Sequence, residues 1–451
     1  MPTPSSRWRR TRRRLHARPV WRLPLTLLAA GVLLAWLLPY LDRVLAHWEH
    51  DYDEALFPEV DGGAMSNLLS AVAGGMITLT GLVFTAITLA MQFGSAQLSL
   101  RVVPMLREDP IMRWSIGTFL ATFVYTLLIS VRLAVREEDY RPVLSMLFAI
   151  GLSVVCALLV LALVTRVTGV LNSGYLLRYL AAEGHEAVRR AHPRVTADDP
   201  EAAPPHQDAA EHAAEPAVIR LGTVPRQGQV LLSFDARRLE EYARETGVGL
   251  ELVPAVGDFI ARQAPLFFVY GPVEHIEQID RETLIGCLLF GDTHGATTDP
   301  GGALRALVDV ALKALSPAVN DPGRAVQALD HIEDLLMVLA PVLHEPASTT
   351  GRGAFRYRTR SWADYVCIAT DEIRHFSGTA LQVQRRLRAL YATVALACAP
   401  EQRAPLRARV AALDAVADAQ WPEELDHRLA RRPDPQGLGS ENGSVTLVRD
   451  A

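Results

Sequence analysis

The stretch "GGMITLTGLVFTAITLAMQFGSAQLSLR", from Gly74 to Arg101, combines the composition of a membrane helix with a regular line of small and polar residues. Steps of four and three residues follow one face of a helix. In this stretch they connect Gly74, Thr78, Gly81, Thr85, Thr88, Gln92, Ser95 and Ser99. None of these eight positions, called here the small-polar face, carries a large apolar side chain. Contact with lipid alone does not explain such a face.

Two interpretations of the small-polar face follow from general membrane chemistry. Small residues let helix backbones approach closely and hydroxyls bond across the contact, so the face is a packing seam between helices. Alternatively, several copies surround an axis and the face lines a polar path, where oxygens and amides replace part of an ion's hydration. The candidate lining residues are Thr78, Gly81, Thr85, Thr88, Gln92 and Ser95. The two interpretations are compatible in an oligomer.

The hydropathy pattern predicts four membrane-spanning helices. A span needs roughly 20 mostly apolar residues, and residues 22–41, 68–93, 114–135 and 143–165 meet this requirement. The N-terminus has six arginines between Arg7 and Arg14, and the loop 42–63 is acidic. Because basic loops stay in the cytoplasm, we expect a multi-pass protein of the bacterial inner membrane with both termini in the cytoplasm.

Changes in composition after the fourth span predict further segments. The fold class predicted for the whole chain is an α-helical membrane protein with four transmembrane helices and a cytoplasmic α+β domain. The predicted boundaries are a basic N-terminus (1–20), the membrane domain (21–170), a helix with an acidic, Pro-rich linker (171–217), a β-rich subdomain (218–273), a helical subdomain (274–425) and a disordered tail (426–451).

The residues predict no enzyme and no cofactor. The four cysteines are far apart in sequence, which argues against a disulfide framework or a zinc site. "GDTHG" places Asp292 and His294 as in the first motif of metallophosphoesterases, but the later motifs of that family are missing. The segment before Asp292 also fits a helix better than a strand. We therefore predict no metal site, and the net charge of −5 predicts no nucleic-acid partner.

A second candidate site lies in "ALVDVALKALSPAVNDPGRAVQALD", from Ala306 to Asp330. Asp321 is placed to cap a helix that begins with Pro322, and Asn320 tolerates a left-handed backbone. The other interpretation is a small-anion site, because a helix N-terminus attracts anions. The residues of this capping or anion-binding loop are Lys313, Ser316, Asn320, Asp321 and Arg324.

Together, the small-polar face, "GTFLATFVYTLL" and "LVDVALKALSPAVNDPGRAVQALD" resemble a family of predicted bacterial membrane proteins, domain of unknown function 2254. The resemblance covers about residues 20 to 420 and implies four spans followed by a cytoplasmic domain. It implies no activity and assigns no role to His294 or Asp299.

The sequence favours an oligomeric ion channel or pore, lined by the second span and assembled or gated by the cytoplasmic domain. The expected partners are the lipid bilayer, further copies of the chain and an ion or small anion. The alternative is a membrane-anchored sensor or scaffold without transport activity, in which the small-polar face serves packing only.

Overall fold

The computed structural model describes residues 21–52, 62–97, 109–135, 143–171, 173–191, 217–220, 228–291, 299–343, 349–352 and 354–440. The chain forms two compact units, divided between Tyr175 and Leu176. The unit before this division is called here the bundle unit, and the unit after it is called the C-terminal unit.

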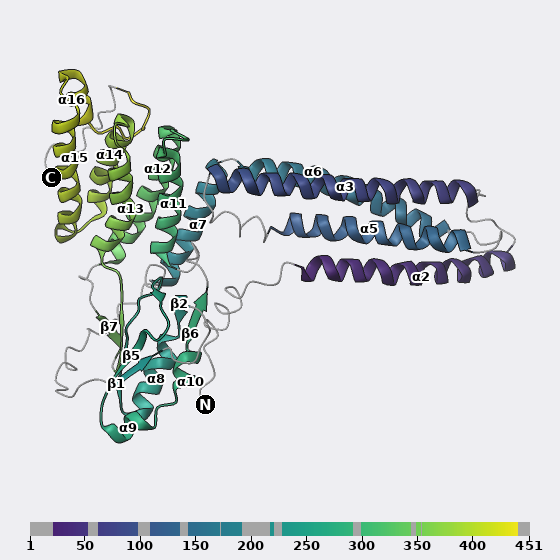
Figure 1. Ribbon diagram of the computed structural model, residues 1–451, viewed down its shortest axis with the longest axis horizontal. Helices are drawn as coiled ribbons and strands as arrows, with labels where there is room; N and C mark the ends of the chain where they lie inside the picture. Colours follow the sequence, from purple (N-terminus) through teal and green to yellow (C-terminus); the bar gives the residue numbers. More distant parts are fainter. Residues whose placement is uncertain are drawn as a thin grey trace. The chain divides into compact units, whose positions relative to one another are not determined.

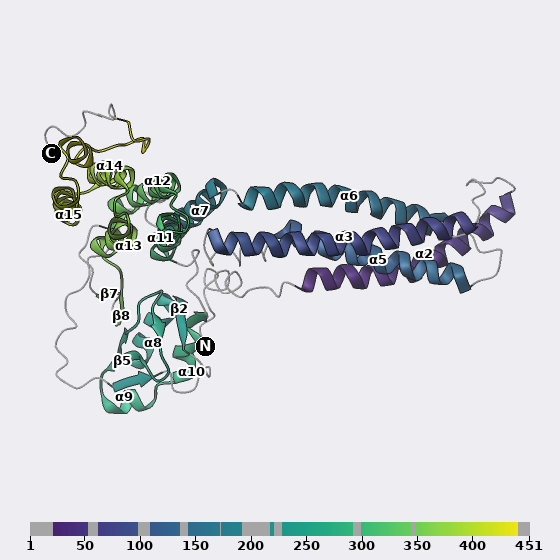
Figure 2. The ribbon, with the colours of Figure 1, turned by 45° about the horizontal axis from the view of Figure 1, so that its top comes forward.

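The bundle unit consists of long apolar helices that lie side by side in both ribbon views (Figure 1, Figure 2). They are α2 (Arg22–Tyr52), α3 (Gly62–Gln97), α5 (Pro110–Val135) and α6 (Val143–Leu171). The stretches long and apolar enough to cross a membrane are Arg22–Val44, Gly63–Leu89, Pro110–Leu133 and Val143–Val167. The predicted membrane fold is therefore confirmed, with four spans close to their expected positions.

Helix α5 is the centre of the bundle and packs against α2, α3 and α6. Its contact with α2 is close because small residues meet there. A Cβ added to Gly117 would lie 2.9 Å from the Cα of Pro24, and one added to Gly31 would lie 2.9 Å from the carbonyl oxygen of Ala121. These contacts show that α2 and α5 run parallel. Close backbone approach at small residues is the usual basis of helix association in lipid.

The C-terminal unit begins within α7 (Ser173–Ala191) and contains two sheets. The larger sheet has the order β1 (Ala217–Arg220), β5 (Pro265–Tyr270), β3 (Gly249–Leu252), β8 (Phe355–Arg358) and β7 (Thr349–Arg352). The smaller sheet has the order β4 (Phe259–Ile260), β2 (Gln229–Phe234) and β6 (Leu288–Gly291). The three short helices of this region are α8 (Ala236–Thr246), α9 (Val273–Glu277) and α10 (Arg281–Gly286).

A helical layer follows the sheets in sequence. Its members are α11 (Pro300–Leu315), α12 (Pro322–Leu339), η2 (Ala340–Val342), α13 (Trp362–Phe376), α14 (Leu381–Ala397), η3 (Pro400–Arg403), α15 (Ala404–Gln420) and α16 (Glu424–Ala430). Helix α11 packs on α12 and α13, and α12 packs on α14. The apolar faces of α11 and α12 are fully buried in this layer, including Leu307, Leu329 and Leu336.

Two details differ from the predictions made from the sequence. Strand β6 and the hairpin β7–β8 join the sheets although they lie within 274–425, and β8 pairs in parallel with β3. The segment before Asp292 is thus a strand, not the expected helix, while Asp292 and His294 themselves lie outside the described residues. The turn between α13 and α14 contains Gly378, which adopts a left-handed φ of 48°.

The predicted disordered tail, 426–451, also differs over its first part, because residues 426–440 are packed. Asp434 is fully buried and accepts hydrogen bonds from the amides of Gly437 and Gly439, at 3.0 and 2.7 Å. The buried Arg385 donates to the carbonyl oxygen of Ser440 at 2.5 Å. These polar contacts order a segment whose composition is that of a flexible tail.

The packing of α2 on α5 predicts how two glycine substitutions differ. Gly117→Ala places a methyl group against Pro24 and Leu27, so we expect a loss of about 1–3 kcal/mol in the free energy of unfolding from overpacking. Gly151→Ala is the matched control, because nothing lies within 4 Å of a Cβ at that position on α6. Measured by unfolding in detergent, the free energy of unfolding of Gly151→Ala should equal that of the wild type or be slightly higher. Equal stability of the two variants would contradict the close contact.

Candidate functional site

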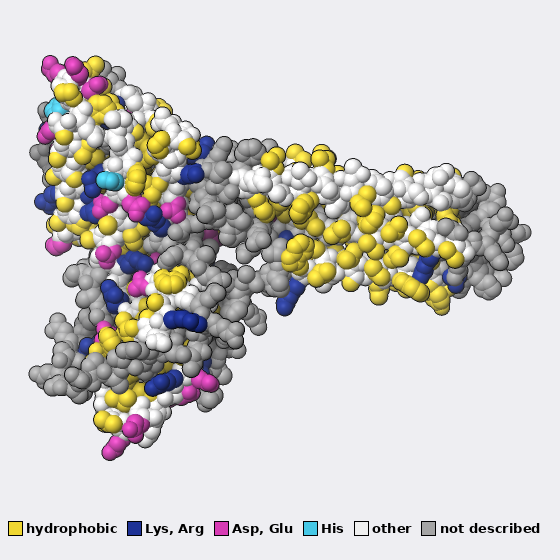
Figure 3. Space-filling view, in the orientation of Figure 1, with side chains coloured by type: hydrophobic (Ala, Val, Ile, Leu, Met, Phe, Trp, Pro, Cys, Tyr) yellow, Lys and Arg dark blue, Asp and Glu magenta, His cyan; other side chains and the backbone are white. Residues whose placement is uncertain are grey.

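The small-polar face lies on the outside of the bundle. Figure 3 shows pale polar and backbone atoms along α3 next to the yellow apolar surface of the bundle. The exposed positions include Gly74, Thr78, Gly81, Thr85, Thr88 and Gln92. A different side of α3 is turned inward, with Met65, Leu69, Ala73, Val83 and Ile87 buried, while Leu82 and Phe84 are exposed like the small-polar face. Ser95 is in the last turn of α3 without a described side-chain environment, and Ser99 lies outside the described residues.

The hydroxyl groups of this face present hydrogen-bond acceptors to the surroundings. Thr78 donates to the carbonyl oxygen of Gly74 and Thr85 to that of Gly81, each at 2.9 Å. Thr88 donates in the same way to Phe84, also at 2.9 Å. A hydroxyl has one hydrogen and two lone pairs. With the hydrogen directed at the helix's own backbone, the oxygen is left to accept bonds from outside.

The glycines of the face leave open space above the helix. A Cβ added to Gly74 or Gly81 meets no atom within 4 Å. Among the described residues, no other span of the same chain therefore packs on this part of α3. The close glycine contacts among the described residues of the bundle lie between α2 and α5 instead, at Gly31 and Gly117.

The interior of the bundle contains a second row of hydroxyls that the sequence analysis did not single out. Thr118, Thr122 and Thr126 of α5 are buried, and the Oγ1 of Thr122 lies 3.3 Å from the Sγ of Cys156 on α6. The signal was present in the sequence, because Gly117 and Ala121 form a small-xxx-small pair. This row belongs to the packing within one chain.

Polar groups also fix one end of the bundle, called here the Asp109 end. Asp109 caps α5 by accepting from the amide of Ile111 at 2.9 Å. Its other oxygen accepts from the Nε of Arg166 on α6 at 2.5 Å. Arg166 also donates to the hydroxyl of Tyr175 at 2.6 Å. The three side chains connect the start of α5, the end of α6 and the start of α7.

The opposite end of the bundle is fixed by Asp42, which the sequence analysis placed in an acidic loop. Helix α2 instead continues to Tyr52, and the side chain of Asp42 is buried. Its carboxylate accepts from the amide of Leu144 at 2.8 Å and from the hydroxyl of Ser145 at 2.5 Å. Asp42 therefore caps α6 from a different helix. A charge near the end of an apolar run does not reveal such a partner about 100 residues away.

In the C-terminal unit, the loop between α11 and α12 has the geometry of a helix cap. Asn320 adopts a φ of 46°, and Asp321 accepts from the amide of Arg324 at 3.0 Å. The guanidinium of Arg324 lies 3.4 Å from the same carboxylate. Ser316 donates to the carbonyl oxygen of Lys313 at 2.7 Å. Arg324 and Asp321 thus face each other, which favours a structural role for the loop over an anion site.

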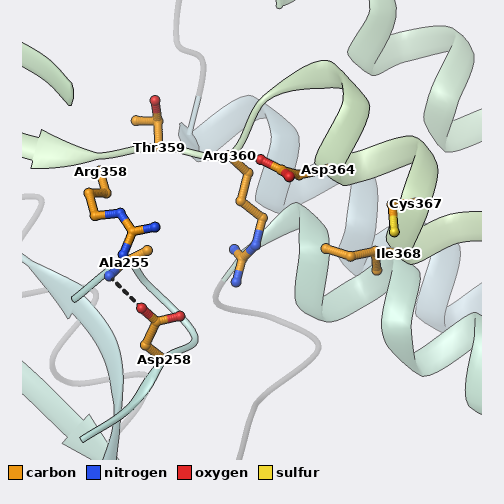
Figure 4. Close-up of a pocket in the computed structure, with 8 residues that line it drawn as sticks. All are labelled: Ala255, Asp258, Arg358, Thr359, Arg360, Asp364, Cys367 and Ile368. Atoms are coloured by element: carbon orange, nitrogen blue, oxygen red, sulfur yellow. Dashed lines mark hydrogen bonds between the residues drawn. The ribbon is translucent and has the colours of Figure 1, made fainter. Parts of the chain in front are cut away.

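A cavity of about 270 Å³ lies beside α13 in the C-terminal unit (Figure 4). Its lining residues are Ala255, Asp258, Arg358, Thr359, Arg360, Asp364, Cys367 and Ile368. The carboxylates already have backbone partners, since Asp258 accepts from Ala255 and Asp364 from Ser361, at 2.9 and 2.8 Å. No group of His, Cys, Asp or Glu able to hold a metal ion occurs among the described residues.

Arg360 connects this cavity with the start of α11. Its guanidinium forms an ion pair with Asp299 and lies against the backbone of Gly257, where a Cβ would be 2.8 Å from its Nη2. Gly257 has a φ of 93°, a conformation that favours glycine. Burial raises the pKa of the Asp299 carboxyl, and the nearby guanidinium opposes that shift. Removing one partner of a buried ion pair destabilises a protein by more than the intact pair stabilises it.

Comparison with known proteins identifies the family of this chain. The model of a family described as predicted membrane protein (DUF2254) matches residues 17–393. The chain belongs to this family. Uncharacterized proteins of Mycobacterium tuberculosis and Mycobacterium bovis are each 24% identical over 387 residues, covering 84% of this chain and 72% of each relative. No solved structure matches the chain. The DUF2254 match includes both units and ends within α14.

The loop at Asp321 gives a stability prediction. Asp321→Ala removes the cap of α12 and should lower the free energy of unfolding by about 1 kcal/mol. Asp321→Asn keeps a capping oxygen. Its free energy of unfolding should fall clearly less, as measured by chemical unfolding of the purified protein. An unchanged stability of the alanine variant, together with a lost affinity for added inorganic phosphate, would instead support the anion site.

Proposed function

We propose that this protein is an oligomeric channel of the bacterial inner membrane, in which the α3 helices of several copies meet and the small-polar face lines a polar path. The position of this face on the outside of its own bundle supports the proposal most strongly. If the face served only packing within the chain, its glycines would lie against another span. They lie in open space instead.

The length of the face supports a path across the whole membrane. From Gly74 to Gln92 the helix rises roughly 27 Å at 1.5 Å per residue, close to the hydrocarbon thickness of about 30 Å. A contact between two helices needs only one or two small-xxx-small steps. A face that continues through the bilayer suits a path better than a local contact.

The orientation of the hydroxyls favours water and cations as the permeating species. Thr78, Thr85 and Thr88 direct their hydrogens to the backbone of α3. Oxygen lone pairs replace the hydration shell of a cation, whereas an anion requires donors. The proposal therefore expects a cation-conducting path, without a fixed charge among the described positions of the face.

The proposal assigns the C-terminal unit to the cytoplasm and to control of the path. Helix α7 supports this role, because it follows the fourth span in sequence and begins the C-terminal unit. Tyr175 at its start accepts a hydrogen bond from Arg166. Gly184 further along faces Leu335 of α12, and His185 lies 2.6 Å from Asp334. Helix α7 thus packs on α12 within the C-terminal unit.

Cysteine accessibility tests the path directly. In a variant without the native cysteines, Thr85→Cys should react with a water-soluble thiol reagent, and the reaction should block cation conductance in planar bilayers. The matched control is Phe84→Cys, one residue away and 63% exposed on the isolated bundle, which should face lipid and stay unreactive. Equal protection of both positions in assembled protein would contradict the path. Assembly without any conductance would favour the sensor or scaffold.

A further inference from the structure

The Asp109 end of the bundle carries two Trp–Arg pairs. Trp21 precedes α2 and Arg22 begins it, and Arg113 and Trp114 are the fourth and fifth residues of α5. The parallel contact of Pro24 with Gly117 brings the two pairs to one level. Arg22 precedes Pro24 by two residues, about 3 Å of rise, and Arg113 precedes Gly117 by four residues, about 6 Å. Both guanidiniums therefore belong to the same rim of the bundle.

The charges of these two arginines are not used within the described part of the chain. Neither Arg22 nor Arg113 forms an ion pair with a described residue, and the Nε of Arg113 is buried without a hydrogen-bond partner. Other arginines of the bundle differ. Arg166 binds Asp109, and Arg132 at the opposite end lies 4.2 Å from the ring centre of Trp36. The guanidiniums of Arg22 and Arg113 therefore have no charged partner among the described residues.

The neighbouring tryptophans indicate where this rim lies in a membrane. Trp21 is 63% and Trp114 48% exposed, and tryptophan prefers the level of the lipid headgroups. Tyr40 on α2 is 64% exposed and lies about 28 Å further along the helix. This separation matches the hydrocarbon thickness of about 30 Å. The guanidiniums of Arg22 and Arg113 are thus at headgroup depth.

We propose that this rim binds the phosphates of anionic phospholipids through Arg22 and Arg113, with Trp21 and Trp114 against the glycerol region. Guanidinium groups donate paired hydrogen bonds to phosphate oxygens. The adjacent surface is apolar and open, since Leu25 is 59% exposed. This surface suits the acyl chains of a lipid and offers nothing to free phosphate. The site is independent of any channel activity.

Native mass spectrometry of the full chain in detergent tests the site. Phosphatidylglycerol is titrated into the wild type and into Arg113→Gln, Arg22→Gln and the double variant. We expect about tenfold weaker phosphatidylglycerol binding for each single variant, the size of one lost charged hydrogen bond. Arg113→Lys keeps the charge and should recover part of the affinity. Phosphatidylcholine binding should not change in any variant.

Arg132→Gln is the matched control, because Arg132 sits at the opposite rim and its guanidinium is covered by Trp36. It should bind phosphatidylglycerol like the wild type, and all variants should keep the elution volume of the folded protein. Unchanged phosphatidylglycerol affinity in the folded double variant would overturn the proposal. An equal loss in Arg132→Gln, or displacement of the lipid by millimolar inorganic phosphate, would overturn it as well.

Discussion

The close contact between α2 and α5 is the constraint on which the arrangement of the bundle depends. In lipid, helices gain no hydrophobic stabilisation from touching each other, so close packing and hydrogen bonds must hold them together. Gly31, Gly117 and Ala121 provide that approach, and the buried threonines of α5 follow the same helix. Because α5 takes this central role, α3 contributes a different side to the bundle and keeps its small-polar face outside.

The two rows of hydroxyls in the membrane therefore have different consequences. The row on α5 is enclosed, with Thr122 in contact with Cys156 of the same chain. The row on α3 is exposed and directs its oxygen lone pairs outward. A small residue stabilises a helix contact only where a second helix is present. The face on α3 thus suits a contact between copies of the chain, and the rim with Arg22 and Arg113 suits a contact with lipid.

The features that sequence could predict are those set by local physics. Bilayer thickness fixes the length of a span, so hydropathy located the four helices, and local backbone chemistry located the left-handed Asn320 and the cap at Asp321. Contacts between distant residues were not predictable in this way. Asp42 caps α6 across about 100 residues, and β8 pairs with β3 although α11 and α12 lie between them in sequence. The segment around Asp434 has a polar composition, and only its buried hydrogen bonds show that it is ordered.

Oxidative cross-linking along α3 tests most directly whether the small-polar face meets the same face of other copies. Single cysteines are placed at Gly74, Thr78, Gly81 and Thr85, and at Leu158 on the exposed surface of α6, in a chain without its native cysteines. In native membranes we expect disulfide-linked dimers for the positions of the small-polar face and none for Leu158. Cross-linking at Leu158 alone, or at no position in folded protein, would contradict a contact between these faces.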